Sequence, residues 1–180
     1  PIVLVDNQLE HKRCNCVKND DFSGGQLLGK YLAEKGMDRI AFVLPEKYST
    51  CQVFENMQFD VSLQERFKGV QSGLLAYGIK FDLENCICNT DFPKMVSGTS
   101  MYDAYVFSDS EKLVTGLREA DVPKGIDFCT FGDTFLKFIK RDCAHIKFNG
   151  YAIGREAARL IANIKPGKVI VEYIATKLEV

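Results

Sequence analysis

Polar side chains that suit a hydroxyl-rich ligand follow several strand-like segments of this sequence. They comprise hydroxyls, carboxylates and one guanidinium, at Ser62, Arg66, Asp91, Ser108, Asp109 and Asp133. An arginine presents a planar fork of donors, and a carboxylate accepts hydrogen bonds from paired hydroxyls. These residue types therefore favour recognition of a polyol or a sugar.

Aromatic residues occur in the same loops and suit the apolar face of a sugar ring. They are Tyr48, Phe54, Phe59 and Phe92. Each candidate also has a structural interpretation. Ser62, Ser108 and Asp109 are suitable helix N-caps, and the remaining aspartates suit turns. Arg66 can form a surface ion pair with a neighbouring carboxylate, and the aromatic residues can belong to the core.

Motifs of the common enzyme classes are missing from the sequence. No phosphate loop or G-x-S-x-G elbow is present, and the glycines of SGGQLLG have the wrong spacing for a dinucleotide fingerprint. His11 and His145 are far apart and have no H-E-x-x-H partner. Cys143 lies near His145, but ordinary residues at a strand edge are the better interpretation. We expect a binding protein without a cofactor and not an enzyme.

The sequence contains seven cysteines, an odd number that does not suit a closed disulfide framework. Cys14 and Cys16 form one C-x-C pair, and Cys86 and Cys88 form another. Zinc sites more often use two to four residues between the cysteines. Small buried thiols in a reducing compartment fit better, so we expect no metal site and a cytoplasmic location.

Composition places the chain among globular proteins. Of its 180 residues, 46% are hydrophobic and 26% are charged, and the net charge is −1. Without a basic excess, this chain alone should bind nucleic acid poorly. No apolar run reaches the roughly 18–20 residues that span a bilayer, and no signal peptide is apparent. Because the chain begins with Pro1 in a strand-like segment, we expect it to be a fragment of a longer protein.

Strand-like and helix-like segments alternate along the chain. The predicted strands are 2–5, 14–17, 39–44, 84–89, 104–107, 128–131, 146–148 and 169–174. The predicted helices are a segment opened by NDDFSGG and ended by Gly36, then 61–78, 110–120 and 151–164, and 45–60 is predicted as a long loop. This alternation predicts an α/β fold with parallel sheets and right-handed crossovers. Ligands bind such sheets at the carboxyl ends of the strands.

The helix predicted over 61–78 carries an unusual cation. Its apolar stripe consists of Leu63, Phe67, Val70 and Leu74. Arg66 lies near the start of this helix, although the helix dipole favours cations at the other end. A ligand or a carboxylate facing Arg66 would account for its position.

Several segments, in order along nearly the whole chain, resemble the lactose-repressor (LacI) family of bacterial transcription regulators. The segment PIVLVDNQ resembles the family's P-V-V-x-V-D strand, and QERFKGVQSGLLAYGI resembles its R-x-x-G-F helix. Four other segments are similar to further family motifs: NDDFSGGQLLGKYLAEKGMDRIAFV, YDAYVFSDSEKLVTGLREADVP, IDFCTFGD and GYAIGREAARLI.

The resemblance implies a type I periplasmic-binding-protein fold, in which a small ligand lies between two α/β lobes joined by crossing strands. It implies that Arg66 points into the cleft and holds the effector. Phe92 matches the family's cleft aromatic residue, and Ser108 matches a ligand-facing position. The family's G-x-D aspartate falls on either Asp133 or Thr134, because GDT is one residue shorter than the motif.

Further ligand contacts are expected from Ser62, Asp109 and Asp21. Closure of the lobes would act through Arg66 on one lobe and through Asp20 or Asp21 on the other.

By the family's topology, residues 1–36 and 147–166 form a partial N-terminal lobe, and residues 37–146 and 167–180 form the C-terminal lobe. The resemblance implies that the DNA-binding helix-turn-helix and about the first half of the N-terminal lobe would lie outside this chain. The unpaired sheet edges that this leaves predict association into a homodimer.

The resemblance therefore implies an effector-binding domain that senses a sugar-like molecule and controls the DNA affinity of a longer protein. A sugar-binding protein for uptake is an alternative. An α/β hydrolase or transferase is disfavoured by the missing catalytic motifs.

Overall fold

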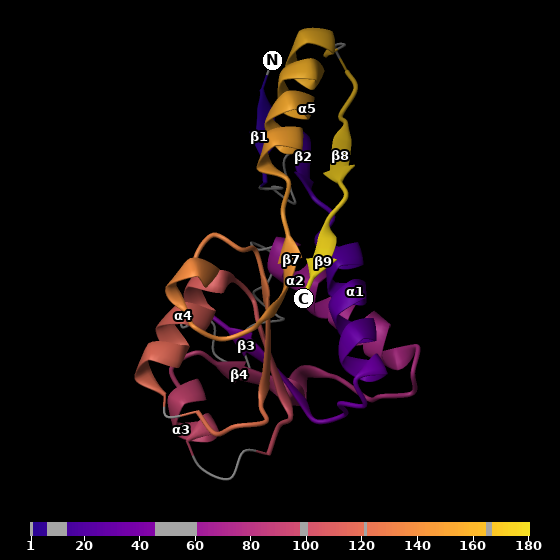
Figure 1. Ribbon diagram of the computed structural model, residues 1–180. Helices are drawn as coiled ribbons and strands as arrows, with labels where there is room; N and C mark the ends of the chain where they lie inside the picture. Colours follow the sequence, from indigo (N-terminus) through magenta and orange to yellow (C-terminus); the bar gives the residue numbers. More distant parts are fainter. Residues whose placement is uncertain (1, 7–13, 46–60, 98–100, 121, 165–166) are drawn as a thin grey trace.

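The structure is a computed structural model that describes residues 2–6, 14–45, 61–97, 101–120, 122–164 and 167–180. It consists of a small unit above a large unit, each built on its own sheet (Figure 1). Three segments of the chain cross between them, at residues 19–21, 147–150 and 174–177. The predicted loop 45–60 lies almost wholly outside the described residues.

The small unit is a three-stranded sheet with one helix against it. Its strands are β1 (Val3–Val5), β2 (Asn15–Asn19) and β8 (Val171–Ile174), which are parallel and lie in the order β1-β2-β8. Helix α5 (Gly150–Asn163) covers one face. The buried residues between them are Val17, Ile153, Ala157 and Leu160.

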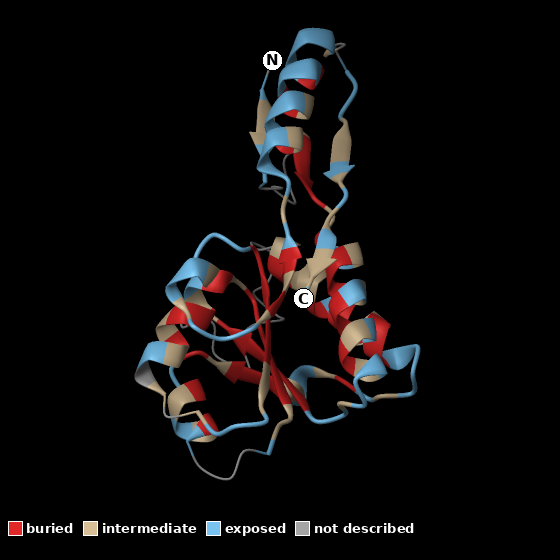
Figure 2. Ribbon diagram, viewed as in Figure 1, coloured by how far each residue is buried: buried red, intermediate tan, exposed pale blue. Residues whose placement is uncertain are grey.

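The large unit contains a six-stranded sheet in the order β4-β3-β5-β6-β7-β9. Its strands are β3 (Ile40–Leu44), β4 (Cys86–Cys88), β5 (Ala104–Phe107), β6 (Asp127–Phe131), β7 (Ala144–Lys147) and β9 (Lys177–Glu179). All pairs are parallel except β7 with β9. The central strands are buried along their length (Figure 2) because helices cover both faces.

Two pairs of helices enclose the large sheet. Helices α1 (Asp21–Glu34) and α2 (Val61–Leu75) cover one face, and α3 (Phe92–Val96) and α4 (Ser110–Glu119) cover the other. Two short 3-10 turns, Leu83–Asn85 and Leu136–Phe138, complete the unit. None of the helices in the described part of the chain is long and apolar enough to cross a membrane.

The predicted fold class is confirmed. Each predicted strand and helix is present, with bounds that differ by a few residues. Strand β9 was not predicted, because its KLE segment is short and is defined by its pairing with β7. The predicted strand 84–89 is shorter than expected, since Leu83–Asn85 forms a 3-10 turn.

The lobe boundaries predicted from the sequence differ from the structure at two segments. Helix α1 was assigned to the N-terminal lobe, but Leu28 and Leu32 bury its apolar side in the core of the large unit. Residues 167–180 were assigned to the C-terminal lobe, but β8 pairs with β2 of the small unit. Helix α1 belongs to the large unit because its apolar side is buried there. Strand β8 belongs to the small unit because it pairs with β2.

Helices α1 and α2 pack with almost no side-chain volume between them. Each contributes glycines spaced four residues apart, Gly25 and Gly29 on α1 and Gly69 and Gly73 on α2. A Cβ atom on Gly25 would lie 2.5 Å from the carbonyl oxygen of Arg66, which real Cβ contacts do not allow. The glycines therefore let the backbones of the two helices approach closely along their middle turns.

We predict that Gly69→Ala destabilises the protein by about 1–3 kcal/mol, because a Cβ atom there would meet the backbone of α1. Gly154→Ala is the matched control. Gly154 lies on the exposed side of α5 with open space around it, so alanine should stabilise the protein by about 0.5–1 kcal/mol. Urea unfolding of both variants tests the pair, and equal effects would contradict the close helix contact.

Candidate functional site

Arg66 lies where the two units meet, with its side chain only 14% exposed. Because α2 begins at Val61, the residue is in the second turn of the helix. Its Nε donates to Asp21 Oδ1 at 2.7 Å, and its Nη1 donates to the backbone oxygen of Ser108 at 2.9 Å. The guanidinium thus joins the first residue of α1 to the carboxyl end of β5.

Two aromatic rings hold the same guanidinium. Its carbon lies 5.3 Å from the ring centroid of Phe131 and 5.2 Å from that of Phe148. Phe131 ends β6, and Phe148 follows β7. Such contacts contribute roughly 0.5–2 kcal/mol each, depending on solvent exclusion. Arg66 is therefore fixed by the ends of three adjacent strands and the start of α1.

The carboxyl group of Asp21 is fully buried. Burial raises its pKa above the ordinary value of 3.8, and the charge and hydrogen bond of Arg66 oppose that rise. Lys18 and the nearby Ser62 hydroxyl also lower this pKa. The pKa of Asp21 is raised overall because the cost of burying its charge exceeds the stabilisation from Arg66, Lys18 and Ser62. The ionised carboxylate therefore has fewer stabilising contacts than it would have in water.

Three buried oxygen atoms near this cluster have no hydrogen-bond partner among the described residues. They are Asn19 Oδ1, Asp21 Oδ2 and Ser108 Oγ. Leaving such an atom unsatisfied costs about 1–3 kcal/mol. Because Asn19 ends β2 and Ser108 follows β5, the two units contribute these atoms from facing strand ends. A ligand that donates hydrogen bonds at this junction would satisfy them.

A buried ion pair ties the small unit to the large one. Lys18 of β2 is fully buried, and its Nζ donates to Glu65 Oε2 of α2 at 2.6 Å. The ring of Tyr173 in β8 lies 5.9 Å from the same nitrogen. Burial raises the pKa of Glu65, and the hydrogen bond from Lys18 lowers it. Lys18 and Glu65 therefore link the units directly beside Arg66.

The structure brings four of the predicted residues together: Asp21, Ser62, Arg66 and Ser108. Asp109 is adjacent to Ser108, but its side chain caps α4 by accepting from the Lys112 backbone nitrogen at 2.9 Å. Asp20 similarly caps α1 by accepting from the Ser23 nitrogen.

The alternatives Asp133 and Thr134 are both exposed in the turn after β6. They follow Gly132, which has a positive φ of 80°. The structure gives no reason to prefer either residue as a ligand contact, and both stay predictions. Asp91 is exposed at the start of α3, where its side chain makes no cap hydrogen bond.

The prediction that Phe92 faces the ligand is wrong. Phe92 is fully buried in the core between the large sheet and α4. Its ring centroid lies 5.0 Å from those of Tyr105 and Phe107, and the absence of a side chain on Gly116 leaves space for it. The remaining aromatic candidates, Tyr48, Phe54 and Phe59, lie outside the described residues.

Sequence reasoning missed Lys18, Glu65, Phe131 and Phe148. Lys18 directly follows the predicted strand 14–17, and the structure extends that strand to Asn19 and buries the lysine, which requires a partner. The two phenylalanines lie at the ends of predicted strands, where the polar candidates were sought. Their contact with Arg66 depends on the order of strands in the sheet.

The described residues contain no group of three His, Cys, Asp or Glu side chains arranged to hold a metal ion. The disfavoured nucleophile pair also lacks the required geometry. Burial raises the pKa of Cys143 to about 12, which keeps it a thiol. His145 Nδ1 lies 3.2 Å from the carbonyl oxygen of Cys143, and its Nε2 faces Glu179.

No protein-family model matches the sequence, and no curated protein is significantly similar to it. Solved structures are similar in fold. One is a LacI family transcriptional regulator from Enterococcus faecium with bound ribose, at 20% identity and a TM-score of 0.74, covering 99% of this chain and 68% of that one. The complex of transcriptional regulator CelR with cellobiose has 19% identity and a TM-score of 0.79, covering 100% and 57%.

A third similar structure is a periplasmic binding protein/LacI transcriptional regulator from Alkaliphilus metalliredigens QYMF with D-xylulofuranose. It has 18% identity and a TM-score of 0.69, covering 99% of this chain and 68% of that one. The chain thus has the fold of LacI-type regulators and periplasmic binding proteins. It spans little more than half to about two thirds of the length of these structures.

We predict that Lys18→Met lowers the free energy of unfolding by about 2 kcal/mol, because Glu65 loses its partner in a largely desolvated position. In a double-mutant cycle with Glu65→Gln, the two effects should be coupled by at least about 1 kcal/mol. Lys30→Met is the control, since the Lys30–Glu34 pair is exposed and should contribute less than about 0.5 kcal/mol. Additive effects of Lys18→Met and Glu65→Gln would contradict the link.

The raised pKa of Asp21 predicts a pH dependence. Its native state binds a proton more readily than its unfolded state, so the stability of the wild type relative to Asp21→Asn should fall as pH rises above 3.8. The pKa of Asp103 is lowered by its hydrogen bond with Arg39, so relative to Asp103→Asn the wild type should lose stability as pH falls below 3.8 and keep its full advantage above that value. Urea unfolding between about pH 2.5 and 6.5 measures both dependences. Stability changes of equal sign with pH in the two comparisons would contradict the opposite pKa shifts of the two carboxyls.

Proposed function

We propose that this chain is the effector-sensing part of a transcriptional regulator, and that it binds a sugar or sugar derivative at the junction beside Arg66. The observation that carries this proposal is the buried guanidinium held by Asp21 and Ser108 next to oxygens that lack partners. A fixed donor fork with nearby acceptors matches the alternating donors and acceptors of a polyol. Ribose, cellobiose and D-xylulofuranose in structures of the same fold support this ligand class.

The ligand would act by changing how the two units sit relative to each other. The units are joined by three crossing segments and by Lys18 and Glu65. A ligand that contacts both units binds one orientation more tightly and shifts the population toward it. Because α1 belongs to the large unit, Asp21 and Arg66 lie on the same side, and Asn19 and Lys18 are the contacts from the small unit.

In the longer protein, the change in orientation would alter DNA affinity through a helix-turn-helix outside this chain. With a net charge of −1, this chain has no overall basic excess to attract DNA. We further propose a homodimer, supported by the edge strands β1 and β8 of the small sheet, and a cytoplasmic protein without enzymatic activity.

Uptake of a sugar by a binding protein of the same fold is the alternative function. It is supported by the similar structure that is described as a periplasmic binding protein/LacI transcriptional regulator. Operator binding by the longer protein that responds to the effector would exclude this alternative.

We predict that the effector raises the melting temperature of this chain by a few degrees, since a ligand at 100 times its Kd adds about 2.7 kcal/mol. Ribose, cellobiose and xylulose are the first probes. Arg66→Lys should abolish the shift, because a lysine keeps the charge and loses the planar fork.

Arg39→Ala is the control for this experiment. Arg39 pairs with Asp103 on the exposed surface before β3, at the opposite end of the sheet from Arg66, so this variant should keep the shift. A shift retained in Arg66→Lys would contradict the proposed function.

A further inference from the structure

The oxygens without partners at the junction define which hydrogen-bonding groups a ligand must bring. Asn19 Oδ1 and Asp21 Oδ2 can only accept hydrogen bonds while the carboxyl is ionised, and Ser108 Oγ can accept or donate. All three residues are at least 98% buried. A ligand that satisfies Asn19 Oδ1 and Asp21 Oδ2 must therefore donate hydrogen bonds. Phosphate and carboxylate groups, which only accept, do not meet this need.

The two buried cations that the described part of the chain places at the junction already have partners. Arg66 is paired with Asp21 and the Ser108 carbonyl, and Lys18 is paired with Glu65. A helix N-terminus is the other common anion site in proteins. Here the N-termini of α1 and α4 are capped by the chain's own carboxylates, Asp20 and Asp109.

Among the residues that the structure describes, carboxylates are in excess over cations at this junction. Besides the two ion pairs, four aspartates lie at the strand ends and helix starts: Asp6, Asp20, Asp109 and Asp133. None of them forms an ion pair with another described residue. Asp6 Oδ1 accepts a hydrogen bond from Asn19 Nδ2 at 2.8 Å, which places its charge beside one of the oxygens without a partner. Among the described residues, the carboxylates at the junction therefore outnumber the cations, which favours a cationic ligand.

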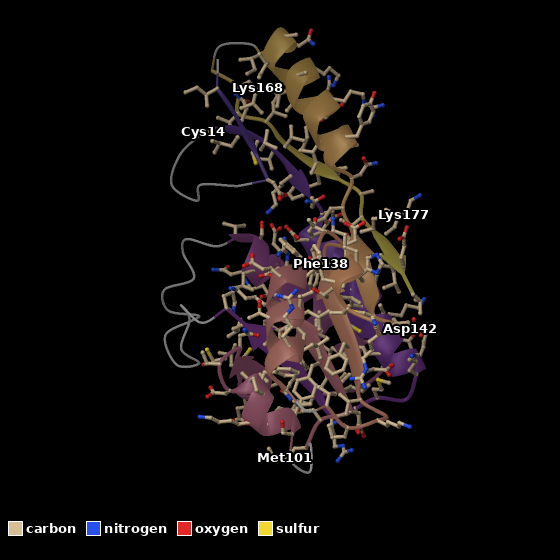
Figure 3. The ribbon with its side chains drawn as sticks, turned by 60° about the vertical axis from the view of Figure 1, so that its left-hand side comes forward. Cys14, Met101, Phe138, Asp142, Lys168 and Lys177 are labelled. Carbon is tan, nitrogen blue, oxygen red and sulfur yellow. The ribbon has the colours of Figure 1, made fainter. Side chains whose placement is uncertain are left out.

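A pocket of about 320 Å³ on the outer side of the crossing segments does contain lysines. Lys147 is paired there with Glu179 at 3.0 Å, and Lys177 lies at the outer edge of the junction (Figure 3). Both lysines are exposed. They therefore do not supply a cation to the buried oxygens around Asp21.

We propose that the ligand of this junction is a polyol that carries a protonated amino group, and that anionic sugars such as sugar phosphates are rejected. This inference rests on the proposed function and narrows its ligand class. The ammonium group donates up to three hydrogen bonds, which matches the surplus of acceptors, and its charge offsets the surplus of carboxylates.

The experiment compares hexoses that differ in one group. Glucose, galactose and mannose are each titrated calorimetrically into this chain at pH 7 and low salt, alongside the corresponding 2-amino sugars and 6-phosphates. For at least one hexose, we expect the amino sugar to bind about tenfold more tightly than the parent, because a charge-assisted hydrogen bond replaces a neutral one. The 6-phosphates should show no binding.

Charge-only variants test the cause of this preference. Asp20→Asn/Asp109→Asn keeps both helix caps, since asparagine caps as well as aspartate, and removes two negative charges. The ratio of amino-sugar affinity to hexose affinity should fall several-fold in this variant. Asp38→Asn, at an exposed aspartate before β3, is the matched control and should leave the ratio unchanged.

The outcomes separate this inference from the proposed function. Hexoses that bind as tightly as their amino sugars, or 6-phosphates that bind more tightly, would overturn the inference and leave the proposed function standing. A preference that survives in Asp20→Asn/Asp109→Asn would also overturn it. If no hexose, amino sugar, ribose, cellobiose or xylulose binds, the proposed function fails and the inference fails with it.

Discussion

The ion pair between Arg66 and Asp21 is the interaction on which the candidate site depends. It is buried at the meeting point of α1, α2 and the ends of β5, β6 and β7. A buried ion pair is weak support for stability, because desolvation of the two charges offsets their attraction. Two observations reflect this desolvation cost: the raised pKa of Asp21, and the buried oxygens of Asn19, Asp21 and Ser108 that lack hydrogen-bond partners. A site that is incompletely satisfied by its own protein suits a ligand that completes it.

The position of this ion pair follows from backbone packing. Glycines at the α1–α2 contact bring the two helices so close that Gly25, in the second turn of α1, lies against the backbone of Arg66. A larger residue at Gly25 or Gly69 would move Asp21 away from the guanidinium. The glycines on α1 and α2 therefore have two effects. They allow the helices to pack closely, and they place Asp21 within hydrogen-bond distance of Arg66.

The fold class and the importance of Arg66 could be predicted from the sequence. Features that depend on contacts between residues far apart in the chain could not. Alternation of strands and helices and the position of Arg66 are local patterns, so they were visible. Phe92 was misassigned because a buried and a ligand-facing aromatic residue look alike without knowledge of Gly116 opposite. Phe148 was missed because only the pairing of β7 with β6 brings it to Arg66. Helix α1 was assigned to the wrong unit for the same reason, because only the fold shows that Leu28 and Leu32 are buried in the large unit.

Glu65 and Arg66 are adjacent on α2 and face different partners. Glu65 binds Lys18 of the small unit, while Arg66 binds groups of the large unit. Any movement of the small sheet that displaces Lys18 acts on the helical turn that positions the guanidinium. Conversely, a ligand that draws Arg66 from Asp21 disturbs the contact of Glu65 with the small unit. Two sites coupled through one rigid turn influence each other by the same free energy in both directions. Under the proposed function, that reciprocity would couple ligand occupancy to the relative orientation of the two units.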